Sequence, residues 1–320
     1  MPDANDALLK RVAAALAALT GSPDSPVLLA VSGGPDSMAM LDLVGNGWAG
    51  PVMAATVDHG LRPESAVEAA MVAGYCAGAG VAHATLCPAS PITGSLQSSA
   101  RAARYRLLHD HADRCGAAYI ITAHHADDQL ETMLMRLARG AGVEGLAGVR
   151  ARNGRILRPL LGCRKAELIA YCERRSIAFA HDPSNANPDF DRVRMRTALA
   201  GFDAVDPRMA VRSAEAFAQA AEALDWMVER EARSIIVAHG DGVQLVSTDY
   251  PPGLLRRLVL RCIGTVQSEF APRGPQIDRL IASLHKGEQA MIGDVLCRIA
   301  KDGQGWCFAP APSRGGTPAD

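Results

Sequence analysis

A short polar loop follows the first strongly apolar segment of the chain and has the residue types of an anion site. Residues 27–31 carry no charge, which predicts a buried parallel strand. The chain then continues as Ser32-Gly33-Gly34-Pro35-Asp36-Ser37. Glycines let backbone amides approach a ligand closely, and proline suits the first turn of a helix. Because helix N-termini bind anions, this strand, loop and helix start together predict a phosphate site.

The loop lacks the lysine of a Walker motif and carries Asp36 instead. A carboxylate beside a polyphosphate is favourable when Mg²⁺ lies between them, whereas a simple turn with Asp36 near the helix cap is the structural alternative. The string SGGPDS resembles the PP-loop of the ATP pyrophosphatase superfamily, whose members cleave ATP between the α and β phosphates. This resemblance implies that ATP is bound by Ser32, Gly33, Gly34, Pro35, Asp36 and Ser37.

A second polar cluster leads from an expected strand at 117–122 into a helix that reaches about residue 139. Its potential ligands are His124, His125, Asp127 and Asp128, with Glu131 one turn later. Asp128 and Glu131 also fit a helix capping box. A transition-metal site is less favoured, because four ligands within five residues cannot all converge on one ion. We expect Asp127 to share Mg²⁺ with Asp36, and Asp128 and Glu131 to receive a cationic amine.

A third polar string, Asp58-His59-Gly60-Leu61-Arg62, follows an expected strand at 51–57. An aspartate at a strand end is often only a turn former. Next to a nucleotide loop, however, Asp58 can line the adenosine site, and we include it among the expected ATP-binding residues.

Basic residues gather between positions 150 and 200, where eleven Lys or Arg stand against five acids in a chain of net charge −1. Arg192, Arg194 and Arg196 alternate as in a strand or an extended arm, which would place three guanidinium groups on one side. Arg101 and Arg104 are three apart on an expected helix. These five arginines are candidate RNA phosphate contacts, with a solvated surface as the alternative.

Expected strands alternate with helices along the first two thirds of the chain, near 27–31, 51–57, 81–86, 117–122 and 156–161. This pattern predicts an α/β fold with a doubly wound, mostly parallel sheet, whose ligands bind beyond the carboxyl ends of the strands. We expect a catalytic domain at 1–203 and a smaller, mainly helical domain at 204–310 that ends in a hairpin at 295–309. Residues 311–320 are rich in Pro, Gly and Ser and predict a disordered tail.

The composition, with 48% hydrophobic and 21% charged residues among 320, is that of an ordinary globular protein. Its eight cysteines form no C-x-x-C pair, which favours reduced, mostly buried thiols over a metal or redox site. The sequence contains no signal-peptide pattern and no apolar run of about 18 residues. We therefore expect a cytoplasmic protein with no membrane partner.

Six strings together resemble the bacterial tRNA(Ile)-lysidine synthetases, in the right order and across most of residues 27–200. They are SGGPDS (32–37), VDHGLRPES (57–65), ARAARY (100–105), HHADDQLETMLMRLARGAGVEGLAG (124–148), RPLL (158–161) and DPSN (182–185). Gln97 and Val193 stand where that family usually has Glu and Asn.

The resemblance implies a two-step ligation. ATP adenylates the ring carbonyl oxygen of the wobble cytidine in the CAU anticodon of tRNA(Ile), and the ε-amine of L-lysine then displaces AMP. Asp36 and Asp127 would hold Mg²⁺, Asp128 and Glu131 the lysine ammonium, and His124 would deprotonate the amine.

The resemblance also implies that the C-terminal domain contacts tRNA, and a homodimer is a further expectation. Two other functions stay open. One is tRNA thiolation by a related PP-loop enzyme, which would require paired cysteines. The other is non-catalytic tRNA binding.

Overall fold

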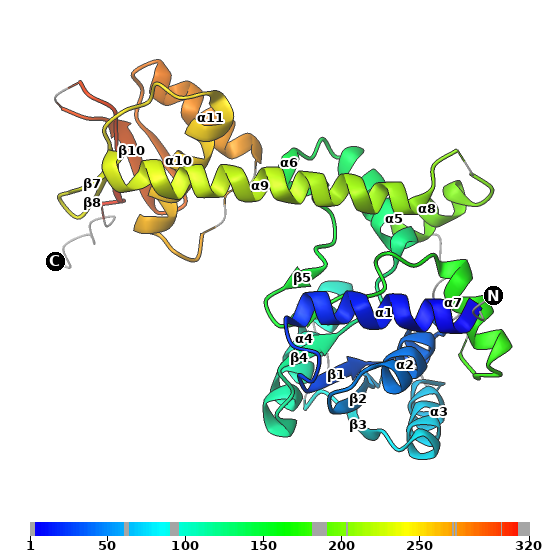
Figure 1. The fold of residues 1–320 in the computed structure, drawn as a ribbon. Coiled ribbons are helices and arrows are strands. Elements are labelled where there is room, and N and C mark those ends of the chain that lie inside the picture. Colours follow the sequence, from blue (N-terminus) through cyan, green and yellow to red (C-terminus); the bar gives the residue numbers. More distant parts are fainter. Residues whose placement is uncertain are drawn as a thin grey trace. The chain divides into compact units, whose positions relative to one another are not determined.

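The computed structural model describes residues 4–60, 64–89, 96–180, 191–202, 204–270, 272, 274–301 and 303–312 (Figure 1). The predictions for Leu61, Arg62, the string at 182–185 and most of the C-terminal tail lie outside these residues, as does the side chain of Gln97. Contacts divide the chain into two compact units, 1–218 and 219–320. The division falls within the long helix α9 (Pro207–Ile235) rather than at the expected boundary near 203.

The first unit is an α/β layered fold. Its elements are α1 (Ala4–Thr20), β1 (Val27–Ala30), α2 (Pro35–Gly47), β2 (Val52–Val57), α3 (Glu64–Ala79), β3 (Ala82–Leu86), α4 (Leu96–Cys115), β4 (Tyr119–Ile121), α5 (Ala126–Leu137), α6 (Val143–Leu146), β5 (Arg152–Asn153), β6 (Ile156–Leu157), α7 (Lys165–Arg174) and α8 (Asp191–Leu199). The sheet order is β3-β2-β1-β4-β6-β5. Every pairing is parallel except that of β5 with β6, which confirms the doubly wound, mostly parallel sheet.

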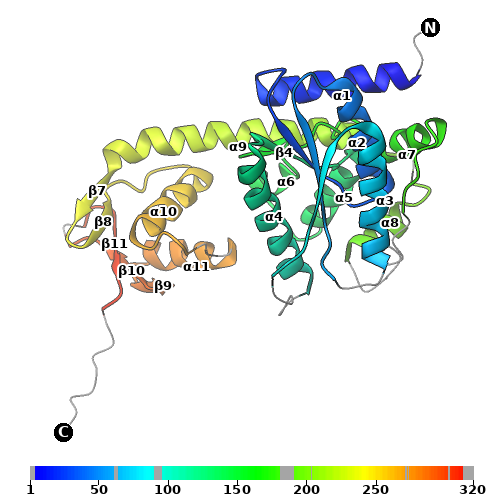
Figure 2. The same ribbon diagram turned by 90° about the horizontal axis from the view of Figure 1, so that it is seen from below.

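Strand β1 lies at the centre of this sheet, and all four of its residues are buried. Alternate side chains of a strand point to opposite faces. Val27 and Leu29 accordingly pack into one core with α1, α2, α3 and α7, while Leu28 and Ala30 pack into a second core with α4. Figure 2 shows the strands between α4 on one side and α2 and α3 on the other. Burial on both faces explains the uncharged sequence of β1.

The chain reverses direction across the sheet at β1. From β1 it passes to β2 and β3 on one side, then crosses to β4 and β6 on the other. Such a switch point leaves a crevice at the carboxyl ends of the strands, because the two connecting segments leave in opposite directions. Ser32 after β1, His59 after β2 and His125 after β4 all border one cavity.

The second unit is smaller and mainly helical, as expected, and it also contains one antiparallel sheet. It contains the end of α9, β7 (Ile236–His239), β8 (Gly242–Leu245), α10 (Pro252–Val266), α11 (Gly274–His285), β9 (Ala290–Ile292), β10 (Val295–Ile299) and β11 (Trp306–Pro310). The expected hairpin is β10 and β11, which pair antiparallel inside a five-stranded sheet of order β7-β8-β11-β10-β9. The apolar sides of α10 and α11 pack with this sheet in one core.

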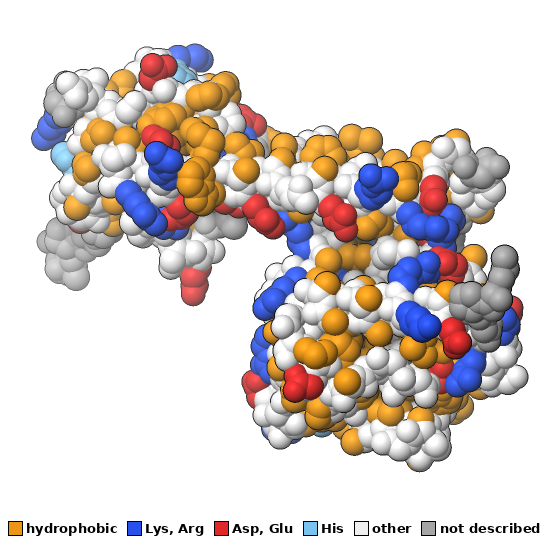
Figure 3. Space-filling view, viewed as in Figure 1, with side chains coloured by type: hydrophobic (Ala, Val, Ile, Leu, Met, Phe, Trp, Pro, Cys, Tyr) orange, Lys and Arg blue, Asp and Glu red, His pale blue; other side chains and the backbone are white. Residues whose placement is uncertain are grey.

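Charge is mixed on the visible surface of the first unit. Figure 3 shows Lys and Arg side chains interspersed with Asp, Glu and apolar side chains on that face. On this face, a nucleic-acid site would therefore have to be formed by particular arginines rather than by a broad basic surface. Within the described ranges, no helix has both the length and the apolar character needed to span a membrane.

One buried carboxylate ties three helices together. Asp42 on α2 is 4% exposed and accepts hydrogen bonds from the hydroxyls of Tyr75 on α3 and Tyr171 on α7, and Arg175 Nε lies 3.4 Å from its Oδ2. Burial opposes the charge, but the two tyrosines and Arg175 outweigh it and hold the pKa of Asp42 below its ordinary value.

We expect Asp42→Asn to lower the free energy of unfolding by roughly 2–4 kcal/mol at pH 7, because it removes a buried charge from its partners. A group whose pKa is lowered by folding stabilises the folded state at pH values above its pKa in the unfolded state. That stabilisation is lost as the pH falls through the pKa of the folded state. The difference between wild type and variant should therefore shrink below about pH 4. Urea unfolding at pH 7 and pH 3 measures this difference in unfolding free energy. Asp110→Asn, a substitution at an exposed position, is the control. An equal difference at both pH values would contradict this account.

Candidate active site

The loop after β1 is held in shape by its own side chains. Gly33 has a φ of +86°, a conformation that favours glycine. The Ser37 hydroxyl accepts a hydrogen bond from the Ser32 amide at 3.1 Å and donates one to the Gly34 carbonyl at 2.9 Å. Gly34 is the N-cap of α2 and provides no side-chain hydrogen bond to the first turn. The amides of that turn are thus available to an anion.

This loop forms the floor of a cavity of about 680 Å³. Its walls come from β2, α3, α4, α5 and α7, as well as from the segment after α7. Ser32, Gly34, Pro35 and Asp36 line it directly. A cavity of this size at a sheet's switch point can hold a nucleotide.

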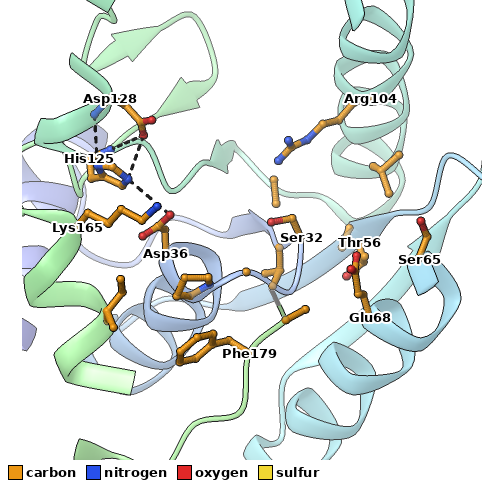
Figure 4. A pocket seen from close by; sticks show the side chains of 18 of the residues that line it. Ser32, Asp36, Thr56, Ser65, Glu68, Arg104, His125, Asp128, Lys165 and Phe179 are labelled. Atoms are coloured by element: carbon orange, nitrogen blue, oxygen red, sulfur yellow. Dashed lines mark hydrogen bonds and ion pairs between the residues drawn. The ribbon is translucent and has the colours of Figure 1, made fainter. Parts of the chain in front are cut away.

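His125 joins two carboxylates at one end of the cavity (Figure 4). Its Nε2 lies 3.5 Å from Asp36 Oδ2 and 3.4 Å from Asp128 Oδ2. Burial disfavours the imidazolium, but the hydrogen bond to Asp36 and the charges of Asp128, Asp36 and Asp127 raise the pKa of His125 above its ordinary value. The other oxygen of Asp36, Oδ1, is buried and has no hydrogen-bond partner among the described residues.

The start of α5 explains why these groups meet. His125 is the N-cap: its side chain accepts a hydrogen bond from the Asp128 amide, and Asp128 accepts one from the His125 amide. The capping box thus consists of His125 and Asp128. The expected box of Asp128 and Glu131 is wrong, because the helix begins two residues before Asp128.

Asp127 is held by the start of α7. Its Oδ2 accepts a 2.7 Å hydrogen bond from the Lys165 amide, and its carboxylate faces the Arg164 guanidinium at 3.3 Å. Burial opposes the charge, but the Lys165 amide and Arg164 prevail and lower the pKa of Asp127. Asp127 Oδ2 also lies 3.7 Å from His125 Nδ1, but Asp128, and not Asp127, lines the described cavity together with Asp36.

Glu131 lies one turn further along α5, with its side chain 5% exposed. Arg196 Nε lies 2.8 Å from its Oε1, and Arg192 Nε lies 3.1 Å from its Oε2. Asp128 Oδ1 is 3.9 Å from Arg192 and 3.8 Å from Arg196. Glu131 and Asp128 thus share two guanidinium groups in a partly buried network.

The expectation of a strand or extended arm for Arg192, Arg194 and Arg196 is wrong, because these residues lie in helix α8. Residues four apart share a helix face whereas residues two apart do not. Arg192 and Arg196 therefore both reach Glu131, and Arg194 pairs with Asp191 on an exposed part of the helix.

Asp58 makes a local turn. Its carboxylate accepts a 2.8 Å hydrogen bond from the Gly60 amide, and it is not among the residues that line the cavity. His59, the next residue, does line it. The described structure thus places the neighbour of Asp58, and not Asp58 itself, at the cavity wall.

His124 and the two arginines of α4 lie together. The charges of Arg101 and Arg104 act on His124, whose Nδ1 lies 2.9 Å from the Thr122 hydroxyl. Burial and nearby arginines lower the pKa of His124 to about 3. A base with so low a pKa has little affinity for a proton, which argues against a role in deprotonating an amine.

Several cavity residues escaped the sequence analysis, among them Lys165, Glu68 and Phe179. Figure 4 shows the Lys165 side chain beside Asp36, at the end of the cavity that holds His125 and Asp128. Lys165 is the first residue of α7 and comes shortly after β6 and the RPLL string. This position was the available signal in the sequence. A single lysine in a basic region carries little information until the fold brings it next to a phosphate loop.

Comparisons with known proteins agree with this geometry. Residues 7–201 match the PP-loop domain family. The chain is 40% identical to the tRNA(Ile)-lysidine synthase of Zymomonas mobilis over 273 residues, covering 82% of both chains. It is 44% identical to that of Novosphingobium aromaticivorans over 269 residues, covering 81% of this chain and 80% of the relative. The U34-tRNA thiolase NcsA from Methanococcus maripaludis shares the fold, with a TM-score of 0.54 and 15% identity over 66% of this chain and 79% of its own.

Proposed function

This chain belongs to the tRNA(Ile)-lysidine synthase family of PP-loop enzymes, and we propose that it uses ATP to ligate lysine to the wobble cytidine of the CAU anticodon of tRNA(Ile). The observation that carries this proposal is one cavity that joins an anion-binding loop to the partly buried carboxylates of Asp36 and Asp128. The loop suits the phosphates of ATP, and the carboxylates suit the ammonium group of lysine. The reaction would take place in the cytoplasm, where both substrates and tRNA occur together.

In the first step, the loop would hold the pyrophosphate leaving group. The amides at the start of α2 and the hydroxyl of Ser32 lie where they can donate hydrogen bonds to phosphate oxygens, while the Ser37 hydroxyl, which donates to the Gly34 carbonyl, holds the shape of the loop. Lys165, which lines the same cavity, adds a cation that is favourable next to a triphosphate. These contacts stabilise the charge that leaves with pyrophosphate when the cytidine oxygen attacks the α phosphate.

The residues present fit a Mg²⁺ ion held with ATP. Asp36 lines the cavity and has a buried oxygen without a partner in the described structure. Proteins usually bind Mg²⁺ through one or two carboxylates together with substrate phosphates and water. We therefore propose Asp36 as the protein ligand, with Asp128, which contacts the same His125 nitrogen, as a second carboxylate of the cavity. When bound, Mg²⁺ would neutralise negative charge on the departing pyrophosphate.

In the second step, Asp128 would orient the lysine amine. Its carboxylate lines the cavity and is only partly engaged, since both arginine contacts exceed 3.7 Å. Glu131 is more deeply buried and fixes Arg192 and Arg196 beside Asp128. We propose that Glu131 acts through these arginines, which set the charge around the bound lysine.

We also propose that the anticodon loop lies against the arginine-rich side of the first unit. Arg101, Arg104 and Arg192 act electrostatically on His124, so their charges are concentrated near the cavity. The target base must be unstacked, because its reacting atoms cannot be reached in a helix. Arg194, which is exposed and paired with Asp191, would contribute to RNA binding mainly through long-range attraction.

ATP labelled in the α phosphate tests the adenylation step. With a CAU tRNA transcript and Mg²⁺, we expect labelled AMP to accumulate in the presence of lysine. Without lysine, the label should appear on the RNA as an adenylated intermediate. Release of ADP, or the same AMP formation with no RNA present, would contradict the proposal.

A further inference from the structure

The charges of four arginines act on one histidine, His124, in the first unit. Burial, followed by the charges of Arg158, Arg101, Arg104 and Arg192, lowers the pKa of His124 to about 3. The imidazole is therefore uncharged at neutral pH. If the Thr122 hydroxyl donates to Nδ1, Nε2 carries the proton and can itself donate a hydrogen bond.

Arg158 is the most buried member of this group, with 6% of its surface exposed. One of its nitrogens, Nη1, donates a 2.6 Å hydrogen bond to the Arg150 carbonyl. Its Nε is buried and has no hydrogen-bond partner among the described residues. A buried donor without a partner is costly, so an absent acceptor is expected here.

Tyr105 connects Arg158 to Arg101. The Tyr105 hydroxyl interacts with Arg158 and lies 3.5 Å from Arg101 Nη2, and the Arg101 guanidinium lies 5.0 Å from the centre of the Tyr105 ring. The charge of Arg101 also acts on both Arg158 and Arg104. Apart from burial, the groups that act most on Arg104 and Arg158 in the described structure are Tyr105 and Arg101.

Arg104 reaches from α4 into the large cavity, on the side of Ser32 and away from Asp36 and Lys165 (Figure 4). Burial lowers the pKa of its guanidinium, and its charge lowers the pKa of His59. The Nδ1 of His59 is also buried without a partner in the described structure. Like charges brought together in a partly dry site repel one another unless an anion lies between them.

We propose that Arg101, Arg104 and Arg158, together with His124, form a pocket for a single phosphate group, separate from the loop after β1. Guanidinium groups are suited to phosphate because their planar forks match its oxygens. The phosphate can come from the RNA backbone next to the target cytidine or from ATP. The inference rests on the proposed function and adds to it a site that would fix the target nucleotide against ATP.

The test compares Arg104→Gln with Arg106→Gln, its exposed neighbour on the same helix. Binding of a synthetic CAU anticodon stem-loop is measured by fluorescence anisotropy without ATP. The same RNA is also used with neutral methylphosphonates at the two phosphates that flank the target cytidine. ATP binding is measured separately by calorimetry without RNA.

If RNA supplies the phosphate, Arg104→Gln should weaken RNA binding about tenfold. In the wild type, methylphosphonates should also lower the affinity for RNA, and this loss of affinity, the methylphosphonate penalty, should disappear in Arg104→Gln. If ATP supplies it, the variant should weaken ATP binding by a similar factor and keep the methylphosphonate penalty. Arg104→Lys, which keeps the charge but loses the fork, should recover part of either loss. Arg106→Gln should match the wild type.

If Arg104→Gln and Arg106→Gln have the same affinity for RNA and the same affinity for ATP, the proposed pocket is overturned. The two proposals fail separately, because these binding measurements do not require ligation. A wild-type protein that binds RNA as expected but incorporates no lysine would retain the pocket and remove the proposed function.

Discussion

Replacing Asp36 by asparagine should reduce the RNA-dependent conversion of ATP to AMP and pyrophosphate by about 10³-fold. The substitution keeps the size of the side chain but removes the charge of the one cavity carboxylate that has a buried, unpartnered oxygen in the described structure. Initial rates at saturating ATP, measured over a range of Mg²⁺ concentrations, give the effect. The apparent requirement for Mg²⁺ should rise together with the loss in rate.

Asp127→Asn is the matched control, because Asp127 lies on the same side of the fold but is already bound by Arg164 and the Lys165 amide. We expect it to lower thermal stability while leaving the Mg²⁺ requirement near that of the wild type. Equal increases in the Mg²⁺ requirement in both variants would instead place Asp127 beside Asp36 at the ion, as the sequence analysis expected.

Replacing Glu131 by alanine should destabilise the first unit and impair use of lysine. The carboxylate is almost fully buried and holds Arg192 and Arg196, so its removal leaves two guanidinium groups beside Asp128 without their main partner. Because these guanidinium groups are partly exposed, the expected cost is about 2–4 kcal/mol, below that of a fully buried pair. Urea unfolding gives the stability change.

The milder Glu131→Gln separates function from stability. It should raise the lysine concentration needed for half-maximal ligation about tenfold, while the ATP requirement stays within about twofold. Glu144→Gln serves as control, since Glu144 pairs with Arg150 on an exposed surface and should change stability by less than about 1 kcal/mol. Equal increases in the lysine and ATP requirements would show that Glu131 supports the fold without affecting the lysine site.

The central sheet and its phosphate loop could be predicted from sequence because their signals are local. An uncharged apolar segment followed by Gly-Gly-Pro is compatible with few local structures other than a buried strand and a tight turn. Alternating strands and helices then restrict the topology to a mostly parallel sheet. Once the sheet is parallel, polar residues after successive strands must open toward one edge. In the structure, Asp36 and Asp128 of the cluster after β4 both contact His125.

The orientation of individual side chains could not be obtained in the same way. Asp127 and Asp128 are neighbours in sequence, but successive helical residues point about 100° apart, and only Asp128 lines the described cavity with Asp36. Which one does so depends on α5 starting at Ala126, with His125 as its cap. A histidine cap is unusual, and the more familiar capping pattern of Asp128 with Glu131 concealed it.

For the arginines of α8, the local sequence pattern predicted the wrong secondary structure. Three arginines at every second position suggest a strand, and no other local signal contradicted that interpretation. The helix places Arg192 and Arg196 on one face, where Glu131 neutralises them. This long-range ion pairing outweighs the local alternation of residues, and it cannot be seen in the sequence of this segment alone.

The most direct test of the proposed function is incorporation of labelled lysine into two tRNA(Ile) transcripts that differ only in the anticodon, CAU or GAU, with ATP and Mg²⁺. We predict incorporation into the CAU transcript alone, and its loss in Asp36→Asn. Incorporation into both transcripts, or into neither while ATP is still converted to AMP and pyrophosphate, would contradict the proposal.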